Sequence, residues 1–181
     1  MLFKKYDKKR TIVGRVTGGL LLSFLLLFAI AGCSPSASGT DKAEATPAQA
    51  TDTPTASQGD GKDLVISVSD VSEKALFVPV DVDGVKLEVI AVKAPDGSIR
   101  TAFNTCQVCY DSGKGYYKQE GDELVCQNCG NRFGMGDVEV TKGGCNPVPI
   151  PEKYKTVTAD TITIPYDLLK EAKTIFSNWK A

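Results

Sequence analysis

Two pairs of cysteines are the residues of this chain best suited to chemistry. They are Cys106 and Cys109, in Cys-Gln-Val-Cys, and Cys126 and Cys129, in Cys-Gln-Asn-Cys, with 16 residues between the pairs. Two residues between thiolates let one tight turn present both sulfurs to a single centre, and two such turns complete a tetrahedral set. The chain has no histidine, so sulfur is the available soft ligand. The spacing predicts a metal or cluster site at these four cysteines.

The identity of the centre stays open at this level. Zn²⁺, a single iron ion and a [2Fe-2S] cluster all accept four cysteine ligands. The alternative is a pair of disulfide bonds, structural or redox-active, which an exported protein can form. A fifth cysteine, Cys145, follows Gly143-Gly144 and precedes Asn146-Pro147. It is either an additional ligand or gate thiol of the centre, or a buried small side chain.

Composition excludes several classes of protein. Without histidine the chain has no Ser-His-Asp or Cys-His nucleophile and no His-ligated zinc. A net charge of −1 and the lack of a phosphate-binding glycine loop argue against nucleic acid as a partner. We expect an electron-transfer or metal-binding protein rather than an enzyme with its own turnover.

Residues 1–32 have the pattern of an export signal. Lysines and arginines precede an apolar run, Leu20–Ile30, that is shorter than the roughly 20 residues needed to span a bilayer. Ile30-Ala31-Gly32-Cys33 resembles the lipobox of bacterial lipoproteins, which implies lipidation at Cys33. The expected location is the membrane surface outside the cytoplasm. A transmembrane anchor extended upstream is the alternative.

Residues 33–62 predict a disordered tether. From residue 34 to 62 there is no Val, Ile, Leu, Phe, Tyr or Trp. Such a segment cannot bury enough apolar surface to offset the entropy of ordering its backbone. We therefore expect one folded domain over residues 63–181.

The pattern of the domain is mainly β. Short apolar runs predict strands at 64–68, 75–80, 85–92, 98–103, 116–118, 123–125, 156–158 and 161–164. Asp83-Gly84 and Gly121-Asp122 are expected to form tight hairpin turns. After Pro165 the period changes, and one helical face collects Leu168, Leu169, Ala172, Ile175, Phe176 and Trp179. We expect a small antiparallel β-sandwich carrying the two CxxC turns and covered by a C-terminal amphipathic helix.

The motifs around the cysteines resemble those of the FtrD-like family of membrane-associated iron–sulfur proteins. The resemblance rests on Phe103–Cys109, Leu124–Phe133 and Gly144–Pro151, and it runs from about Leu64 to the C-terminus. It implies an iron–sulfur centre that relays electrons beside a membrane iron transporter or another redox partner. Larger members carry several transmembrane helices before this domain, and here the lipid anchor would replace them.

The layout is also similar to a Rieske domain, with Cys109 and Cys129 at the positions of its histidines. An all-cysteine centre implies a lower reduction potential than a Rieske centre. Arg132 is either a hydrogen-bond donor near the sulfurs or a solvated surface residue, and Phe133 is expected in the core. Two other functions stay open: a structural zinc ribbon within a binding module, and a thiol–disulfide oxidoreductase.

Overall fold

The computed structural model describes residues 61–181 of the chain. The expected export signal and nearly all of the expected tether lie outside the described residues. Every strand pairing in the described part is antiparallel. The expected mainly antiparallel β fold with a C-terminal helix is therefore confirmed.

The largest sheet has four strands in the order β2-β3-β4-β8. Its strands are β2 (Leu76–Val82), β3 (Val85–Lys93), β4 (Ile99–Cys106) and β8 (Pro147–Pro149). The turn from β2 to β3 is the predicted dipeptide, and Asp83 and Gly84 both have positive φ, 50° and 78°. Two successive residues of positive φ are what a tight two-residue hairpin turn needs.

Two three-stranded sheets and one short helix complete the described part. The first sheet has the order β1-β10-β9, with β1 (Leu64–Ser67), β10 (Thr161–Ile164) and β9 (Thr156–Val157). The second has the order β5-β6-β7, with β5 (Tyr117–Glu120), β6 (Glu123–Cys126) and β7 (Arg132–Gly134). The helix α2 (Tyr166–Ala172) continues into the 3₁₀ turn η5 (Lys173–Phe176). Further 3₁₀ turns are η1 (Val68–Asp70), η2 (Tyr110–Ser112), η3 (Met135–Asp137) and η4 (Glu152–Tyr154).

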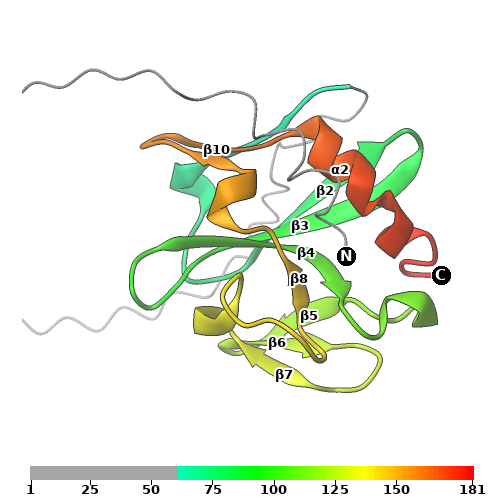
Figure 1. The fold of residues 1–181 in the computed structure, drawn as a ribbon. Helices are drawn as coiled ribbons and strands as arrows, with labels where there is room; N and C mark the ends of the chain where they lie inside the picture. The colour runs from blue at the N-terminus through cyan, green and yellow to red at the C-terminus, as the bar shows by residue number, and fades with distance from the viewer. Residues whose placement is uncertain (1–60) are drawn as a thin grey trace, which may run out of the picture. The chain divides into compact units, whose positions relative to one another are not determined.

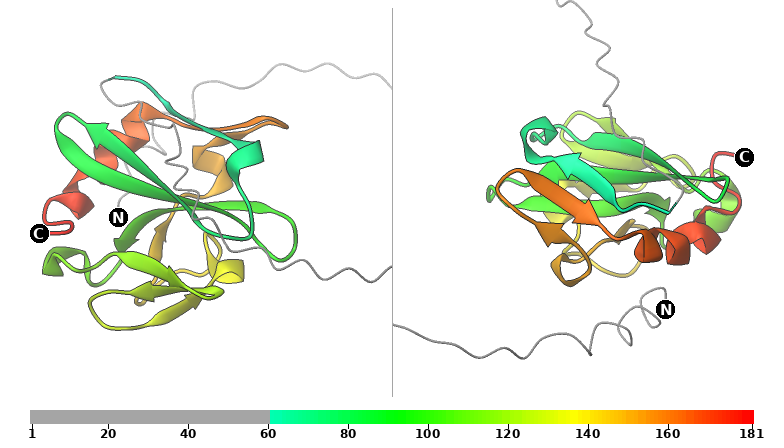
Figure 2. Two further views of the ribbon diagram at one scale, coloured as in Figure 1. Left: turned by 180° about the vertical axis from the view of Figure 1, so that it is seen from behind. Right: turned by 90° about the horizontal axis from the view of Figure 1, so that it is seen from above.

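The four-stranded sheet is buried on both faces. Along β3, Leu87, Val89 and Ala91 enter one hydrophobic core, while Ile90 and Val92 enter the other. Successive side chains of a strand point to opposite faces, so a strand buried on both faces supplies two cores. The first core also receives residues of β1, β10 and α2, and the second receives residues of β5, β6 and β7. Figure 1 shows this arrangement, with β3 and β4 between α2 and the β5–β7 sheet, and in the view from above in Figure 2 β1 and β10 run side by side.

Two strands and the end of the helix differ from expectation. The sequence pattern predicts no strand at Arg132–Gly134 or Pro147–Pro149, which form β7 and β8. Proline lacks the N–H that a strand donates, so it is tolerated at a sheet edge, and β8 is an edge strand. The α-helix ends at Ala172, before the apolar stripe does, and the 3₁₀ turn carries the stripe on to Phe176.

A buried ion pair fixes the loop that follows β7. The Nζ atom of Lys155 donates to a carboxylate oxygen of Glu139, to the hydroxyl of Thr101 at 2.9 Å and to the carbonyl of Ile150 at 3.3 Å. The same Glu139 oxygen accepts the backbone N–H of Thr101, on β4, at 2.9 Å. The Lys155 side chain is 1% exposed. Glu139 holds its place with a φ of 71°, a conformation that costs a residue other than glycine about 1–3 kcal/mol.

We expect Lys155→Met to destabilise the protein strongly. The substitution leaves the Glu139 carboxylate without its cation, and breaking a buried pair by removing one partner costs about 3–5 kcal/mol. Urea denaturation of the variant and the wild type measures the loss. Lys142→Met, at an exposed lysine of the same region, is the control. Equal stabilities of the two variants would contradict the role given to the pair.

Candidate metal centre

The first cysteine turn begins at the end of β4. Cys106 is fully buried in the second core, and Cys109, three residues on, is half-buried. The backbone N–H of Cys109 donates to the Cys106 sulfur at 3.3 Å. Burial acts to raise the pKa of Cys106, but hydrogen bonds from the Tyr117 hydroxyl and from the backbone N–H groups of Val108 and Cys109 outweigh it and lower the pKa.

The second cysteine turn begins at the end of β6. Cys126 is buried, and Cys129 is exposed. Gly130, at a φ of 71°, reverses the chain and donates its N–H to the carbonyl of Cys126 at 2.9 Å. The Cys126 sulfur accepts the backbone N–H groups of the residues two and three positions later, Asn128 and Cys129. The Cys106 sulfur accepts from the equivalent residues of the first turn. The two turns are therefore built alike.

The start of β5 holds the two turns together. Gly115 accepts the N–H of Cys106 at 2.6 Å, Tyr116 accepts the N–H of Gln127 at 2.8 Å, and Tyr117 pairs with Cys126 across the sheet. At Gly115 an added Cβ would lie 2.2 Å from the carbonyl oxygen of Cys109. Only glycine fits there, because a real Cβ essentially never approaches backbone so closely.

A third loop brings Cys145 to the same place. Pro147, two residues later, pairs with Cys106 across β4 and β8. The side-chain amide of Asn131, beside the second turn, donates to the carbonyl of Cys145 at 2.9 Å. The Cys145 sulfur lies 3.2 Å from the sulfur of Cys106, 3.8 Å from that of Cys109 and 2.8 Å from that of Cys129. Cys145 therefore contacts sulfurs of both CxxC turns.

The structure thus gathers five thiols in one place. The sulfurs of Cys106, Cys109, Cys126 and Cys145 all lie within 4.8 Å of one another. The CxxC spacing predicts Cys129 in the ligand set, and it leaves Cys145 as an additional ligand, a gate thiol or a buried small side chain. Cys129 is the exposed member of the cluster; its sulfur lies 2.8 Å from that of Cys145 and also hydrogen-bonds with the sulfurs of Cys126 and Cys109, but it is not in the mutually close set of four. All five cysteines are free thiols in the described part of the chain, with no disulfide among them.

The donor set fits a thiolate-bound metal centre. In a tetrahedral site with metal–sulfur bonds of about 2.3 Å, two sulfurs are about 3.8 Å apart. The four mutually close sulfurs are within 4.8 Å, so small shifts bring them to that spacing. All the candidate ligands are sulfur, a donor set that both iron–sulfur centres and structural zinc sites accept.

The thiols of the cluster differ in their pKa values. Burial and the neighbouring thiol of Cys106 raise the pKa of Cys109 to about 11. Burial together with hydrogen bonds to neighbouring sulfurs raises the pKa of Cys145. In Cys129 the shift is downward, as it is in Cys106, because hydrogen bonds from the thiol of Cys145 and the N–H of Asn131 lower the pKa of Cys129 to about 7. The exposed thiol is therefore the one that ionises first without a metal.

Tyr117 is a site residue that the cysteine motifs do not predict. Its ring is buried, and its hydroxyl donates to Cys106 and lies 3.9 Å from the sulfur of Cys145. Asn104 fixes its backbone, accepting the Tyr117 N–H at 2.7 Å and donating to its carbonyl at 3.2 Å. Burial raises the pKa of Tyr117 far above its usual range, so the hydroxyl stays a donor.

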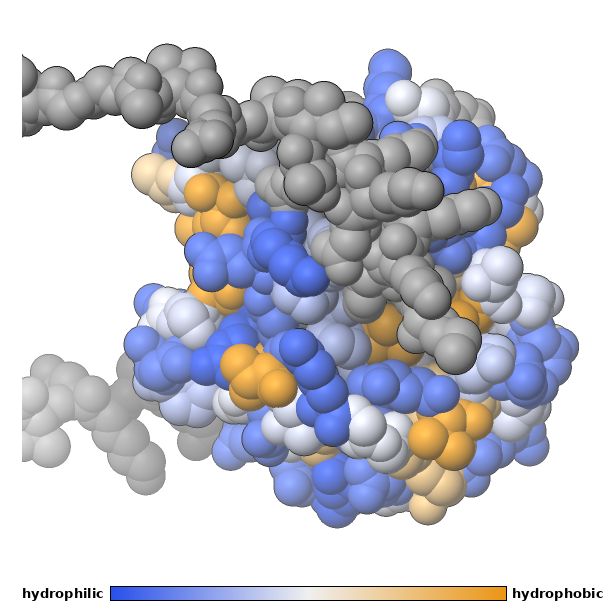
Figure 3. Space-filling model, in the orientation of Figure 1, coloured by the Kyte–Doolittle hydropathy of each residue, from blue (hydrophilic) through white to orange (hydrophobic). Residues whose placement is uncertain are grey.

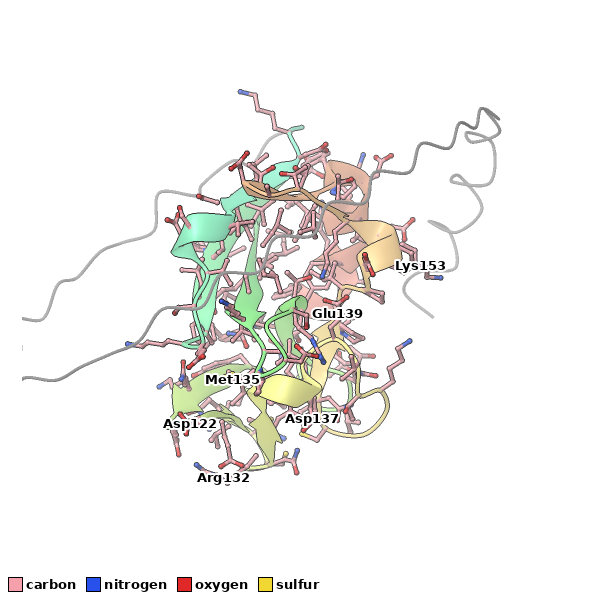
Figure 4. All side chains as sticks on the ribbon, turned by 90° about the vertical axis from the view of Figure 1, so that its left-hand side faces the viewer. Asp122, Arg132, Met135, Asp137, Glu139 and Lys153 are labelled. Atoms are coloured by element: carbon pink, nitrogen blue, oxygen red, sulfur yellow. The ribbon has the colours of Figure 1, made fainter. Side chains whose placement is uncertain are left out.

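Arg132 is a surface residue, and no hydrogen bond from it to a sulfur is present. Its Nε donates to Glu123 at 2.6 Å and its Nη1 to Glu120 at 3.2 Å. These two carboxylates face each other across the β5–β6 hairpin, so the guanidinium offsets their repulsion. Figure 4 shows Arg132 at the outer side of this sheet, together with Asp122. Phe133, beside it, is buried in the second core as expected.

The surface of the described part is mixed in character. The large apolar side chains that are exposed there are Val65, Val108, Val140 and Val157. On the face drawn in Figure 3, the hydrophobic residues form separate spots within a mainly hydrophilic surface. Within residues 61–181, no helix has the length and apolar character needed to cross a bilayer.

Fold and site together define a β domain with a cluster of cysteines that could hold a metal. The model of the FtrD-like family, described as membrane iron–sulfur containing protein FtrD-like, matches residues 68–176. The chain belongs to this family, as the motif resemblance indicated. No curated protein and no solved structure matches the chain. The family is membrane-associated, and its name together with the cysteine cluster supports an iron-related metal-binding function.

We expect alkylation of the reduced, metal-free protein to start at Cys129. The thiolate is the reactive form, so its rate should rise as the pH passes through about 7, while Cys109, with a pKa of about 11, stays mostly protonated there. Timed iodoacetamide labelling with peptide mass spectrometry, at pH values on both sides of 7, measures each cysteine separately. Faster labelling of Cys109 than of Cys129 at neutral pH would contradict the assignment.

Proposed function

We propose that this chain is an extracytoplasmic, membrane-tethered electron-transfer protein with an iron–sulfur centre, acting with a membrane iron transporter or its redox partner. The observation that most supports this proposal is that five thiols from three loops lie together. The sulfurs of four of them are within 4.8 Å of one another. Membership of a membrane iron–sulfur family supports iron as the metal. When bound, such a centre supplies one-electron transfer.

The protein's own residues would tune and shield the centre. The sulfurs of Cys106 and Cys126 each accept two backbone N–H groups, and Cys106 also accepts the Tyr117 hydroxyl. Hydrogen bonds to the sulfurs stabilise their negative charge and so favour the reduced state. Cys106 and Cys126 lie in the second core while Cys129 reaches solvent, so one side of the site is open to a partner.

A membrane tether completes the proposal. Residues 1–32 would serve as the export signal, lipidated Cys33 as the anchor, and residues 33–62 as a flexible linker to the domain at 63–181. A disordered linker of this length has a root-mean-square reach of roughly 30 Å, which lets the centre approach a membrane partner. Each buried CH₂ of the acyl chains contributes about 0.8 kcal/mol to anchoring.

A single-ion zinc site is the second candidate, and one observation favours it. Four sulfurs all within 4.8 Å of one another match the edges of a tetrahedron around one ion. In that case the metal would brace the loops of a binding module without redox chemistry.

Anaerobic purification of the full chain in detergent, with analysis for iron, acid-labile sulfide and zinc, tests the proposed function. We expect bound iron and sulfide, with visible absorption that bleaches on reduction. Cys106→Ser should abolish the absorption because it removes a buried sulfur, whereas Val108→Ala, at an exposed position in the same turn, should retain it. A colourless protein with one zinc ion would support the second candidate, and a metal-free wild type would contradict both.

We expect Cys33→Ala to abolish lipid anchoring of the protein. The variant lacks the thiol that would be acylated, so it should appear in the soluble extracytoplasmic fraction or remain as an unprocessed precursor. Cell fractionation and intact-mass analysis distinguish these products from a lipidated mature chain. Ser34→Ala, at the next residue, is the control, and membrane retention of Cys33→Ala as a processed chain would contradict lipid anchoring.

A further inference from the structure

The cluster holds five thiols, one more than a tetrahedral site needs. The two CxxC motifs alone suggest that each turn supplies both of its cysteines. In the structure, the first turn contributes both Cys106 and Cys109 to the mutually close set, whereas the second contributes only Cys126. The fourth sulfur of that set comes from the third loop, at Cys145.

We propose that Cys106, Cys109, Cys126 and Cys145 bind the metal centre and that Cys129 stays outside it as an accessible thiol. This inference rests on the proposed metal-binding function and deepens it, because it assigns the ligands. It departs from the set that the CxxC spacing predicts by one exchange, Cys145 for Cys129.

Burial separates the two candidates for the fourth position. Cys106 and Cys126 are buried, Cys109 and Cys145 are half-buried, and Cys129 is exposed. The apolar shell around a metal site controls the access of solvent to it, so the less exposed of two sulfurs is the better enclosed candidate. Cys145 meets this condition better than Cys129 does.

The backbone holds Cys145 in place from two sides. Its neighbour Asn146 accepts the N–H of Gln107, within the first turn, at 3.0 Å, and Pro147 pairs with Cys106 across the sheet. From the other side, the Asn131 amide donates to the Cys145 carbonyl at 2.9 Å. The third loop is thereby attached to both CxxC turns, which is the arrangement expected of a loop that supplies a ligand.

Cys129 remains close enough to act on that ligand. Its sulfur is 2.8 Å from the sulfur of Cys145. This separation is shorter than those from Cys145 to the sulfurs of Cys106 and Cys109, which are 3.2 and 3.8 Å. An accessible thiol in contact with a bound one is placed to exchange with it. Cys129 is therefore the position at which a thiol reagent from solvent would first meet the site.

Two matched variants of the full chain in detergent test the assignment, with Co²⁺ as the probe metal. Cobalt absorbs in the visible range when thiolates bind it, so titration gives both affinity and ligand type. Loss of a direct ligand should exceed the roughly 10–100-fold cost of losing a residue that only supports one. We therefore expect Cys145→Ser to weaken binding more than about 100-fold and Cys129→Ser less than about 10-fold.

Alkylation of the Co²⁺-loaded wild type is a second test, and it does not depend on whether a variant folds. We expect N-ethylmaleimide to label Cys129 while the other four thiols are protected, with Cys33 followed on its own peptide. Protection of Cys129 with labelling of Cys145, or a loss in Cys129→Ser that equals that in Cys145→Ser, would overturn the assignment. Failure of the wild type to bind either Co²⁺ or iron would instead contradict the proposed function itself.

Discussion

The site depends on one backbone segment, Gly115–Tyr117, which hydrogen-bonds to both cysteine turns. Its Gly115 carbonyl accepts from Cys106, and its Tyr116 carbonyl accepts from Gln127 in the second turn. The chain at Gly115 passes so close to the first turn that no side chain fits there. Because the two turns are bonded to consecutive residues, their separation is fixed by the covalent length of the chain rather than by packing alone. The third loop then joins a site that is already closed on one side.

Repulsion between neighbouring thiolates explains why this cluster would favour a bound cation. Two partly buried unit charges 4 Å apart repel by about 4 kcal/mol, so several thiolates at this spacing cannot coexist without compensation. Burial raises the pKa values of Cys109 and Cys145, and the neighbouring sulfurs raise them further. The ion pairs of residues 61–181 join lysines and arginines to carboxylates, and Arg132, the basic residue nearest in sequence to the second turn, is held by two glutamates. A metal cation bound at the proposed site would supply the missing positive charge.

The hairpins were predictable because their signals are local. Asp83-Gly84 and Gly121-Asp122 set tight turns between alternating strands, and both hairpins formed where those dipeptides placed them. The strands β7 and β8 gave no such signal, since each has three residues and β8 is rich in proline. The place of Cys145 follows from the pairing of β8 with β4, a contact between segments about 40 residues apart. Spacing within a CxxC motif carries no information on such a contact, so the fifth thiol could be noticed in the sequence but not positioned.

Comparison with the Rieske arrangement shows what an all-sulfur site changes. Replacing two imidazoles by thiolates adds negative charge to the centre and lowers its reduction potential. The hydrogen bonds to Cys106 and Cys126 act in the opposite direction, since each donor stabilises the more negative, reduced state. Tyr117 strengthens this second effect, because its buried hydroxyl is held as a donor against Cys106. The potential of a centre bound here would thus be set by how many N–H and O–H donors reach the sulfurs, and most of those donors belong to the turn backbones themselves.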